Sequence, residues 1–418
     1  MSNQSRHFKK ILSRINVITV CVCAILLQGV FFACTEIKDP KFEKIVLSEK
    51  FHGEGSCIGD FNKDGVSDVA IGHYWYAGPD FKKRSQFFDG QDFDPVGYSE
   101  CFGMFVGDFN GDGWDDILVC PDPGKEGFWF ENPKNNSGMW ERYLATDELG
   151  NESWVLADVL GNGKKGLLFN RNGYLGIATP NLDRPYEPWD FFAISYQDDR
   201  YQRYTHGIGY GDITGNGKMD IIERVGWWEQ PSDPMMTPWK FHEFTFADAA
   251  AHMLIYDVDG DGLNDVVTVL QCHLYGFAWY RQVRKDGVIT FEQNVLIPRS
   301  DKMFDPDENS FPKVSQLHAL VAADINGDGI PDAVTGKRYW AHGPEGDIAT
   351  NDPAILMWWE TKREGKNTTL IPHIIDENSG VGMNFTIGDL NSDGTPDIVI
   401  GNKKGAFIFL NKQLISVK

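Results

Sequence analysis

The chain contains 418 residues, of which 42% are hydrophobic and 13% aromatic, so it is not an intrinsically disordered protein. This length accommodates two or three domains or one large repeat array. The formal charge of −21 makes nucleic acid a poor partner.

Residues 1–33 are predicted to be a secretory signal peptide. An apolar run over residues 15–32 follows a segment whose charged residues are all basic: Arg6, Lys9, Lys10 and Arg14. The sequence FFAC at the end of this run resembles a bacterial lipobox, with Phe31 where Leu is usual, and predicts lipidation of Cys34. We therefore expect a tether over residues 34–40, a mature charge of −25 and a lipid-anchored protein of the bacterial cell envelope, periplasmic or surface-exposed. An uncleaved membrane anchor is the alternative.

Four further cysteines follow the predicted lipidation site: Cys57, Cys101, Cys120 and Cys272. Their spacing matches neither a zinc knuckle nor a dense disulfide framework. The sequence leaves open whether two of them form a disulfide.

A nine-residue motif recurs along the chain. In DFNGDGWDD (108–116) acidic or amide side chains occupy positions one, three, five and nine, and glycine occupies position six. The motif begins at seven places: Asp60, Asp108, Asp158, Asp212, Asp257, Asp324 and Asp389. Intervals of 45 to 67 residues are typical of propeller blades. We therefore predict an all-β, seven-bladed β-propeller over residues 41–418.

Each motif is predicted to lie between two strands. An apolar run such as HMLIYD leads into it, and a β-branched run such as DVVTV leaves it. An aromatic third strand and a fourth strand follow, as in GFWFENP from Gly127 and WERYLAT from Trp140, so each blade should contain four strands. The seventh repeat ends after its third strand, GAFIFLN. We expect KFEKIVLSE, residues 41–49, to supply the missing outer strand and close the ring.

The motif has the ligand pattern of a calcium loop, because carboxylates on alternate positions and an inward-turning glycine can supply the oxygens that Ca²⁺ takes. Five loops carry such side chains at all four positions and are predicted to bind Ca²⁺: Asp60, Asn62, Asp64 and Asp68; Asp108, Asn110, Asp112 and Asp116; Asp257, Asp259, Asp261 and Asp265; Asp324, Asn326, Asp328 and Asp332; Asp389, Asn391, Asp393 and Asp397. The fourth loop, with Thr214 and Asn216, is weaker, and the third, with Leu160 and Gly166, should not hold an ion. Alternatively, the aspartates hold these turns through backbone hydrogen bonds without metal.

The seven motifs resemble the FG-GAP or VCBS repeats of integrin-type propellers. The resemblance implies a propeller fold and says little about an activity. The motif is therefore interpreted as a scaffold element that stiffens the blades.

Histidines are predicted to gather at the face opposite the motif loops, where first strands begin and second strands end. The residues expected there are His52, Glu54, His73, His206, His252, His273, His318, Lys337, Arg338 and His342. His206, His252 and His318 open the first strands of three consecutive blades and are predicted to bind a catalytic Zn²⁺ or another divalent metal. His252 lies five residues before its aspartate and the other two lie six before theirs, so strand alternation could turn it away. Structurally satisfied histidines are the alternative.

Two insertions are expected on the same face: residues 298–315 between the fifth and sixth blades, and residues 341–354 within the sixth. Long loops on one rim often form the walls or lids of binding sites. Surface decoration is the alternative.

Three stretches are similar to the propeller domain of aldos-2-ulose dehydratase and its bacterial relatives: HLYGFAWYRQ (273–282), SQLHALVAADINGDGIPDAVTGKRYWAHG (315–343) and SGVGMNFTIGDLN (379–391). The resemblance is best from about residue 200 onward. It implies a metal-dependent carbohydrate dehydratase site for a keto-sugar such as 1,5-anhydrofructose. The chain departs from the fungal enzyme in lacking cupin and lectin-like domains, so an isomerisation assigned to a cupin is not expected.

Elimination beside a carbonyl needs an electrophile for the developing enolate, a base for the carbon-bound proton and an acid for the departing oxygen. A divalent ion on neutral imidazoles is a suitable electrophile, and His206, His252 and His318 are the expected ligands. His273 is the expected base.

The remaining predicted roles concern the substrate. Arg338 or His342 is expected to orient it, and Lys337, Tyr339 and Trp340 are expected to form a sugar-facing wall. The sequence thus favours an extracytoplasmic, metal-dependent carbohydrate dehydratase or lyase. The main alternative is a non-catalytic, calcium-stabilised lipoprotein that binds glycans or proteins, and a third is a structural partner in an outer-membrane complex. Several imidazoles and a cation suit an enzyme better than a binding platform.

Overall fold

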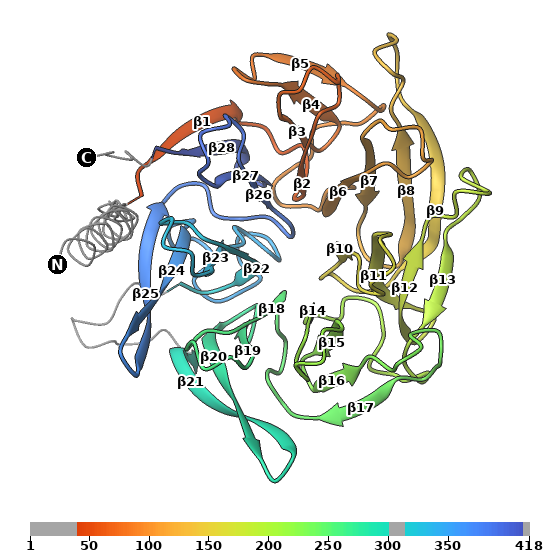
Figure 1. The fold of residues 1–418 in the computed structure, drawn as a ribbon. Helices are drawn as coiled ribbons and strands as arrows, with labels where there is room; N and C mark the ends of the chain where they lie inside the picture. Colours follow the sequence, from red (N-terminus) through yellow and green to blue (C-terminus); the bar gives the residue numbers. More distant parts are fainter. Residues whose placement is uncertain (1–39, 301–313, 413–418) are drawn as a thin grey trace, which may run out of the picture. The chain divides into compact units, whose positions relative to one another are not determined.

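Seven four-stranded antiparallel sheets form a ring in the computed structural model, which describes residues 40–300 and 314–412 (Figure 1). The predicted seven-bladed β-propeller is therefore confirmed. Within these two ranges, no helix has the length and apolar character needed to cross a membrane. The predicted signal peptide, Cys34, nearly all of the tether and most of the insertion at 298–315 lie outside the described residues.

The first three blades follow the chain from the centre of the ring outward. Blade 1 contains β2 (Ser56–Gly59), β3 (Asp68–Ile71), β4 (Tyr74–Ala77) and β5 (Lys83–Gln86). Blade 2 contains β6 (Gly103–Gly107), β7 (Asp116–Cys120), β8 (Lys125–Glu131) and β9 (Glu141–Leu149). Blade 3 contains β10 (Val155–Ala157), β11 (Gly166–Arg171), β12 (Tyr174–Thr179) and β13 (Asp190–Ala193).

The next three blades have the same strand order. Blade 4 contains β14 (Ile208–Gly211), β15 (Asp220–Glu223), β16 (Gly226–Glu229) and β17 (Lys240–Glu243). Blade 5 contains β18 (Met253–Tyr256), β19 (Asp265–Val269), β20 (Tyr275–Lys285) and β21 (Val288–Ser300). Blade 6 contains β22 (Leu317–Ala323), β23 (Asp332–Lys337), β24 (Leu356–Glu364) and β25 (Asn367–Asp376).

Blade 7 is built from both ends of the described chain. It contains β26 (Thr386–Gly388), β27 (Asp397–Asn402), β28 (Gly405–Asn411) and, as its outer strand, β1 (Phe42–Ser48). β1 pairs antiparallel with β28, from Phe42 opposite Asn411 to Ser48 opposite Ala406. The predicted closing strand is therefore confirmed, and it pairs an edge of β28 that would otherwise be open.

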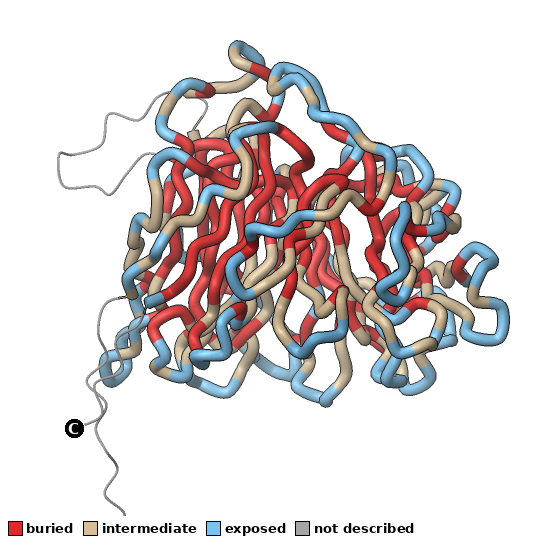
Figure 2. Tube along the Cα trace, turned by 90° about the horizontal axis from the view of Figure 1, so that it is seen from above, coloured by how far each residue is buried: buried red, intermediate tan, exposed pale blue. Residues whose placement is uncertain are grey.

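The core lies between neighbouring blades. The described residues contain seven hydrophobic clusters, and each joins side chains of two adjacent blades, as Trp154 of blade 3 does with Phe102 and Trp129 of blade 2. Buried residues fill the strand layer, and exposed residues concentrate in the loops (Figure 2). Cys57, Cys101, Cys120 and Cys272 are buried free thiols, so no disulfide joins them.

Each motif forms the turn between the first two strands of its blade. In the first loop, Asp60 accepts hydrogen bonds from the backbone N–H groups of Asp64 and Gly65 at 3.0 and 2.9 Å. Gly65 has a φ of 83°, a conformation that glycine adopts without strain. The first aspartate accepts backbone hydrogen bonds in all seven loops: Asp60, Asp108, Asp158, Asp212, Asp257, Asp324 and Asp389.

The ninth-position aspartate locks this turn to the third strand. Asp332 is fully buried, and its oxygens accept hydrogen bonds from the backbone N–H groups of Ile325 and Thr361 at 3.0 and 2.8 Å. Five others do the same in their blades: Asp68, Asp116, Asp220, Asp265 and Asp397. Each of these carboxylates therefore fixes the positions of three strands relative to one another.

Amide side chains extend the network from blade to blade. Gln282 Nε2 donates to the Ile213 carbonyl oxygen at 3.0 Å, and Asn132 Nδ2 donates to the Phe61 carbonyl oxygen at 2.9 Å. Each donor belongs to the blade after that of its acceptor. The motif face therefore carries hydrogen bonds around the ring, which leaves the opposite face free for a functional site.

Replacing Asp332 with Ala should lower the free energy of unfolding by about 2–4 kcal/mol, because two buried backbone N–H groups lose their acceptor. Chemical denaturation in the presence of a calcium chelator measures this loss without any contribution from a bound cation. Asp199→Ala, at an exposed position, is the control and should change stability by less than about 0.5 kcal/mol. Equal stabilities of the two variants would contradict the role given to Asp332.

Candidate functional site

The mouth of the ring opposite the motif loops is lined by residues that lie at a fixed sequence distance before each motif. Counting six residues back from the first aspartate of each motif reaches the start of the innermost strand. The seven residues so reached are Glu54, Phe102, Glu152, His206, Ala251, His318 and Met383. Four of these are ionisable, and the second strands add further polar groups from their ends.

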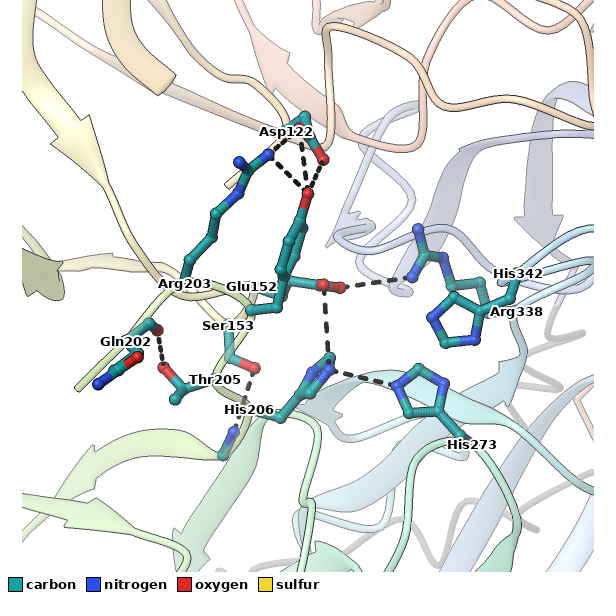
Figure 3. Close-up of polar contacts among 12 residues, drawn as sticks. Asp122, Glu152, Ser153, Gln202, Arg203, Thr205, His206, His273, Arg338 and His342 are labelled. Carbon is teal, nitrogen blue, oxygen red and sulfur yellow. Dashed lines mark hydrogen bonds and ion pairs between the residues drawn. The ribbon is translucent and has the colours of Figure 1, made fainter. Parts of the chain in front are cut away.

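Three histidines from blades 4, 5 and 6 meet at this mouth. The Nε2 atoms of His206 and His273 lie 3.3 Å apart. The ring of His318 lies with its centroid 5.9 Å from that of His206 and 5.2 Å from that of His273. The predicted meeting of His206 and His318 is therefore present, and His273 completes the group. Figure 3 shows His206 and His273 of this group.

The three imidazoles are held neutral. The Nδ1 atom of His318 lies 3.0 Å from the Gln316 carbonyl oxygen, so it carries the hydrogen and leaves a lone pair on Nε2. That Nε2 atom is buried and has no hydrogen-bond partner among the described residues. Burial lowers the pKa of both His318 and His206 far below the usual value, and the positive charge of Arg338 lowers them further. Neutral imidazoles with free lone pairs are ready to bind a metal ion.

A buried ion-pair network lies beside the histidines. Arg338 donates two hydrogen bonds to Glu54, at 2.9 and 3.0 Å, and approaches a Glu152 oxygen at 3.4 Å. The other Glu152 oxygen lies 4.0 Å from His206 Nε2. Burial raises the pKa of Glu152 to about 7, although the charge of Arg338 opposes the rise. Glu152 can therefore exchange a proton near neutral pH.

The insertion at 341–354 brings a carboxylate to the same place. Asp347 accepts hydrogen bonds from the backbone N–H of His342 at 3.1 Å and from its Nδ1 at 2.9 Å. The Asp347 Oδ1 atom, which accepts the bond from His342 Nδ1, also lies 3.8 Å from His273 Nδ1. Burial alone would raise the pKa of Asp347, but the hydrogen bonds from His342 hold it below its usual value. Asp347 therefore stays ionised and positions two imidazoles.

Two residues expected in the site lie elsewhere. His252 Nε2 lies 3.2 Å from the Trp154 carbonyl oxygen and faces a largely apolar cavity of about 540 Å³ in the central channel. Its offset of one residue from the common spacing accounts for the different direction. Lys337 is buried and donates to Ser315 Oγ at 3.1 Å and to the Ala349 carbonyl oxygen, so its ammonium group anchors the insertion.

Aromatic side chains surround the polar centre. Tyr98 and Tyr204 are 45% and 44% exposed. Tyr339 and Trp340 stack on each other with ring centroids 4.8 Å apart. Lys403 Nζ lies 4.8 Å from the centre of the Tyr98 ring, and burial lowers the pKa of this lysine to about 8. This rim offers flat apolar faces and hydrogen-bond donors.

Glu152, Asp347 and Lys403 belong to the site although the sequence patterns did not single them out. Glu152 occupies the same six-residue offset as His206 and His318, so applying that count to every blade would have found it. Lys403 follows the ninth-position aspartate of blade 7 by six residues, as Arg338 does in blade 6. Asp347 lies in an insertion without a repeat counterpart, so no spacing predicts it.

The carboxylates of the motif loops lie at the opposite face. In the fifth loop, ligand atoms of Asp257, Asp259 and Asp265 lie within 4.8 Å of one another, as a shared cation requires. Arg281 also pairs with Asp259, at 2.5 Å, and with Asp261, at 2.9 Å. An ion in this loop would therefore share its carboxylates with a guanidinium group.

A metal ion would fit the histidine group at the mouth. Ligand atoms of His206, His273 and Cys272 lie within 4.8 Å of one another. The ring of His318, whose Nε2 has no hydrogen-bond partner among the described residues, lies with its centroid 5.2 Å from that of His273. Burial raises the pKa of the Cys272 thiol, so imidazoles are the better ligands here. We therefore assign His206, His273 and His318 as the residues that could hold a divalent ion.

In the comparison with protein families, the FG-GAP-like repeat model matches residues 257–335. A search of curated proteins found no match. The chain is similar in structure to an Agrocybe aegerita lectin whose recognition of non-reducing terminal N-acetylglucosamine is described, with 16% identity, 90% of this chain and 86% of the lectin covered, and a TM-score of 0.45. It is also similar to BBS1N from a complex with ARL6DN, with 10% identity, 89% and 99% coverage, and a TM-score of 0.46. With TM-scores below 0.5, neither likeness supports an inference about this chain.

The buried neutral histidines should make the metal-free protein less stable in acid. The unfolded chain takes up protons at a histidine pKa of about 6.5, and His206 and His318 resist protonation in the folded state, so stability falls as the pH drops through that value. Each histidine should account for up to about 2 kcal/mol between pH 7 and pH 5. Urea unfolding of chelator-treated protein over this range measures the slope.

The variant His318→Gln should show a shallower pH dependence than the wild type. His373→Gln, on the outer strand β25, is the control and should retain the wild-type slope. An unchanged slope in His318→Gln would mean that His318 takes up protons in the folded protein.

Proposed function

We propose that this protein is an extracytoplasmic, metal-dependent carbohydrate dehydratase or lyase that acts on a keto-sugar by elimination next to its carbonyl. The observation that carries the proposal is the meeting of His206, His273 and His318, with a buried and unpartnered Nε2 on His318. A polar atom buried without a partner is costly in a purely structural role. A ligand that accepts the lone pair removes this cost.

Such an elimination would use the metal for one purpose. A divalent ion held by these three imidazoles would stabilise negative charge on the substrate's carbonyl oxygen. The burial of the site favours this role, because electrostatic interactions are stronger where water is excluded. The protein's own groups then have to move two protons, one from carbon and one to the departing oxygen.

His342 is the best-placed proton acceptor. Its Nδ1 donates to Asp347 at 2.9 Å, which leaves Nε2 free to accept a proton, and its side chain is 45% exposed at the mouth. Asp347 would stabilise the imidazolium that forms, because it stays ionised. His273, which the sequence predicts as the base, is better suited as a metal ligand because its Nε2 faces that of His206.

Glu152 is the corresponding candidate for the proton donor. Its pKa of about 7 leaves a substantial protonated fraction at neutral pH. Arg338 is 2% exposed and saturated by Glu54 and Glu152, so it positions Glu152 instead of contacting the substrate. A sugar would approach over the aromatic rim, where Tyr98, Tyr204 and the stacked Trp340 could pack against its ring faces.

The cellular location and the structural ions are also proposals. The charged and apolar pattern of residues 1–34 supports export and a lipid anchor on Cys34. Carboxylate spacing supports Ca²⁺ in the five fully equipped motif loops. The hydrogen bonds within all seven turns equally fit the metal-free alternative.

A non-catalytic glycan-binding lipoprotein is the second candidate. The exposure of Tyr98 and Tyr204 beside a polar centre favours it, because sugar-binding surfaces combine stacking rings with hydrogen-bonding groups. This alternative leaves the paired imidazoles and the hydrogen-bonded His342 and Asp347 without a role. The two candidates differ in whether the substrate is changed.

Incubation with 2-keto and 3-keto sugars, with Zn²⁺ or Mn²⁺ supplied, should produce an ultraviolet-absorbing enone. His342→Gln should lower kcat about 100-fold or more, because it removes the proton acceptor. His242→Gln, on the outer strand β17, should retain full activity. Binding of a sugar without any enone would favour the second candidate, and wild-type kcat in His342→Gln would overturn the role given to this residue.

Calcium removal should destabilise the ring if the five loops hold ions. Chelation should lower the free energy of unfolding by about 2.7 kcal/mol for each site that was filled at 100 times its Kd. Asp108→Asn should reduce this response. Asp158→Asn is a matched control, since Asp158 makes the same turn hydrogen bonds in a loop that should not bind an ion. Equal responses in the two variants would support turns held by hydrogen bonds alone.

A further inference from the structure

A second cluster of metal-ligand type lies at the junction of blades 1 and 7. His52 precedes β2, His73 lies between β3 and β4, and Asp92 lies between β5 and β6. One ligand atom from each residue lies within 4.8 Å of the other two. These three residues have no part in the elimination proposed above, so the cluster needs its own explanation.

Both imidazoles are buried, and the buried Nδ1 atom of His52 has no hydrogen-bond partner among the described residues. His52 is 1% exposed and His73 is 2% exposed. The two rings meet edge to face, with centroids 5.3 Å apart. Among the residues that the structure describes, none forms a hydrogen bond with the His73 ring.

The surroundings orient these groups toward one point. His52 Nδ1 lies 2.7 Å from Asp92 Oδ1, and His52 Nε2 lies 2.8 Å from Ser48 Oγ. Lys50 Nζ holds the other Asp92 oxygen at 2.6 Å. A histidine that binds metal through one nitrogen commonly donates from the other nitrogen to a neighbouring oxygen, as Ser48 allows here. Ser48 and Lys50 thus act as outer contacts that fix the ligands.

We propose that His52, His73 and Asp92 form a structural site for Zn²⁺ or a similar divalent transition metal. Two imidazoles and one carboxylate are a donor set that zinc prefers over the all-oxygen sets of calcium. Tetrahedral zinc would place its ligand atoms about 3.3 Å apart. Binding therefore requires Asp92 Oδ1 to move by a few tenths of an ångström from His52, which its 35% exposed side chain permits.

The position of this site gives the ion a mechanical role. Ser48 ends β1, the strand that closes the ring, and His52 follows it by four residues. His73 and Asp92 belong to blade 1 and to the segment that leaves it. A metal bound by these residues would therefore link the end of the closing strand β1 to the first blade. This link would stabilise the closed ring in addition to the β1–β28 hydrogen bonds, because the metal binds the folded state.

Metal analysis of the full chain tests this site separately from the catalytic one. Protein loaded with Zn²⁺ and freed of excess metal should lose one equivalent in His73→Asn and in Asp92→Asn. His318→Gln should lose a different equivalent and retain this one. His373→Asn, a ring stacked on Trp358 in blade 6, is the matched control and should lose none.

Cobalt substitution adds a readout of geometry. Co²⁺ bound to His318→Gln should give the intense visible absorption of a tetrahedral site, and this band should vanish when Asp92→Asn is added. The partly exposed Asp92 is the safer position, because the variant leaves the buried packing of the imidazoles intact. Retention of the full metal content and cobalt band after the Asp92 and His73 substitutions would overturn the proposal. The proposal would also be overturned if His318→Gln lost all of the metal that the wild-type protein binds.

Discussion

The buried aspartate at the ninth position of six of the seven motifs is the constraint on which the rest of the structure depends. Its two oxygens bind the turn after the first strand and the backbone beyond the third strand, as Asp332 does with Ile325 and Thr361. The innermost strand of the blade therefore has a fixed height in the ring. A side chain six residues before the motif therefore lies at the opposite mouth, as those of His206 and His318 do.

The two faces of the ring manage charge in different ways. The motif face uses carboxylates as acceptors for backbone N–H groups, so its negatively charged side chains stabilise the turn in every blade. The opposite mouth buries a guanidinium between Glu54 and Glu152 and keeps the neighbouring imidazoles neutral. Removing one member of such a buried network is costly, because the remaining charge loses its partner. The mouth is therefore organised around its polar groups, and its apolar residues pack between the blades.

The sequence predicted the blade count, the four-strand pattern and the closing strand β1, because each repeat carries its own turn signal and alternation. It also predicted that His206 and His318 converge, since both follow one spacing rule. The side chain of His252 breaks that rule by one residue and faces the channel, which strand alternation explains. Asp347 could not be predicted, because an insertion outside the repeat has no internal reference that fixes its position. The hydrogen bonds of Lys337 could not be predicted either, because they depend on where Ser315 and Ala349 lie in the folded protein.

The proposed function requires that closure of the ring assembles a metal-binding imidazole group from blades 4, 5 and 6. Anomalous diffraction at the zinc absorption edge, from crystals of protein grown with Zn²⁺, tests this claim most directly. The expected result is a peak bonded to His206, His273 and His318. A map with no peak there at full zinc occupancy elsewhere, or with the His206 and His318 rings far apart, would contradict it.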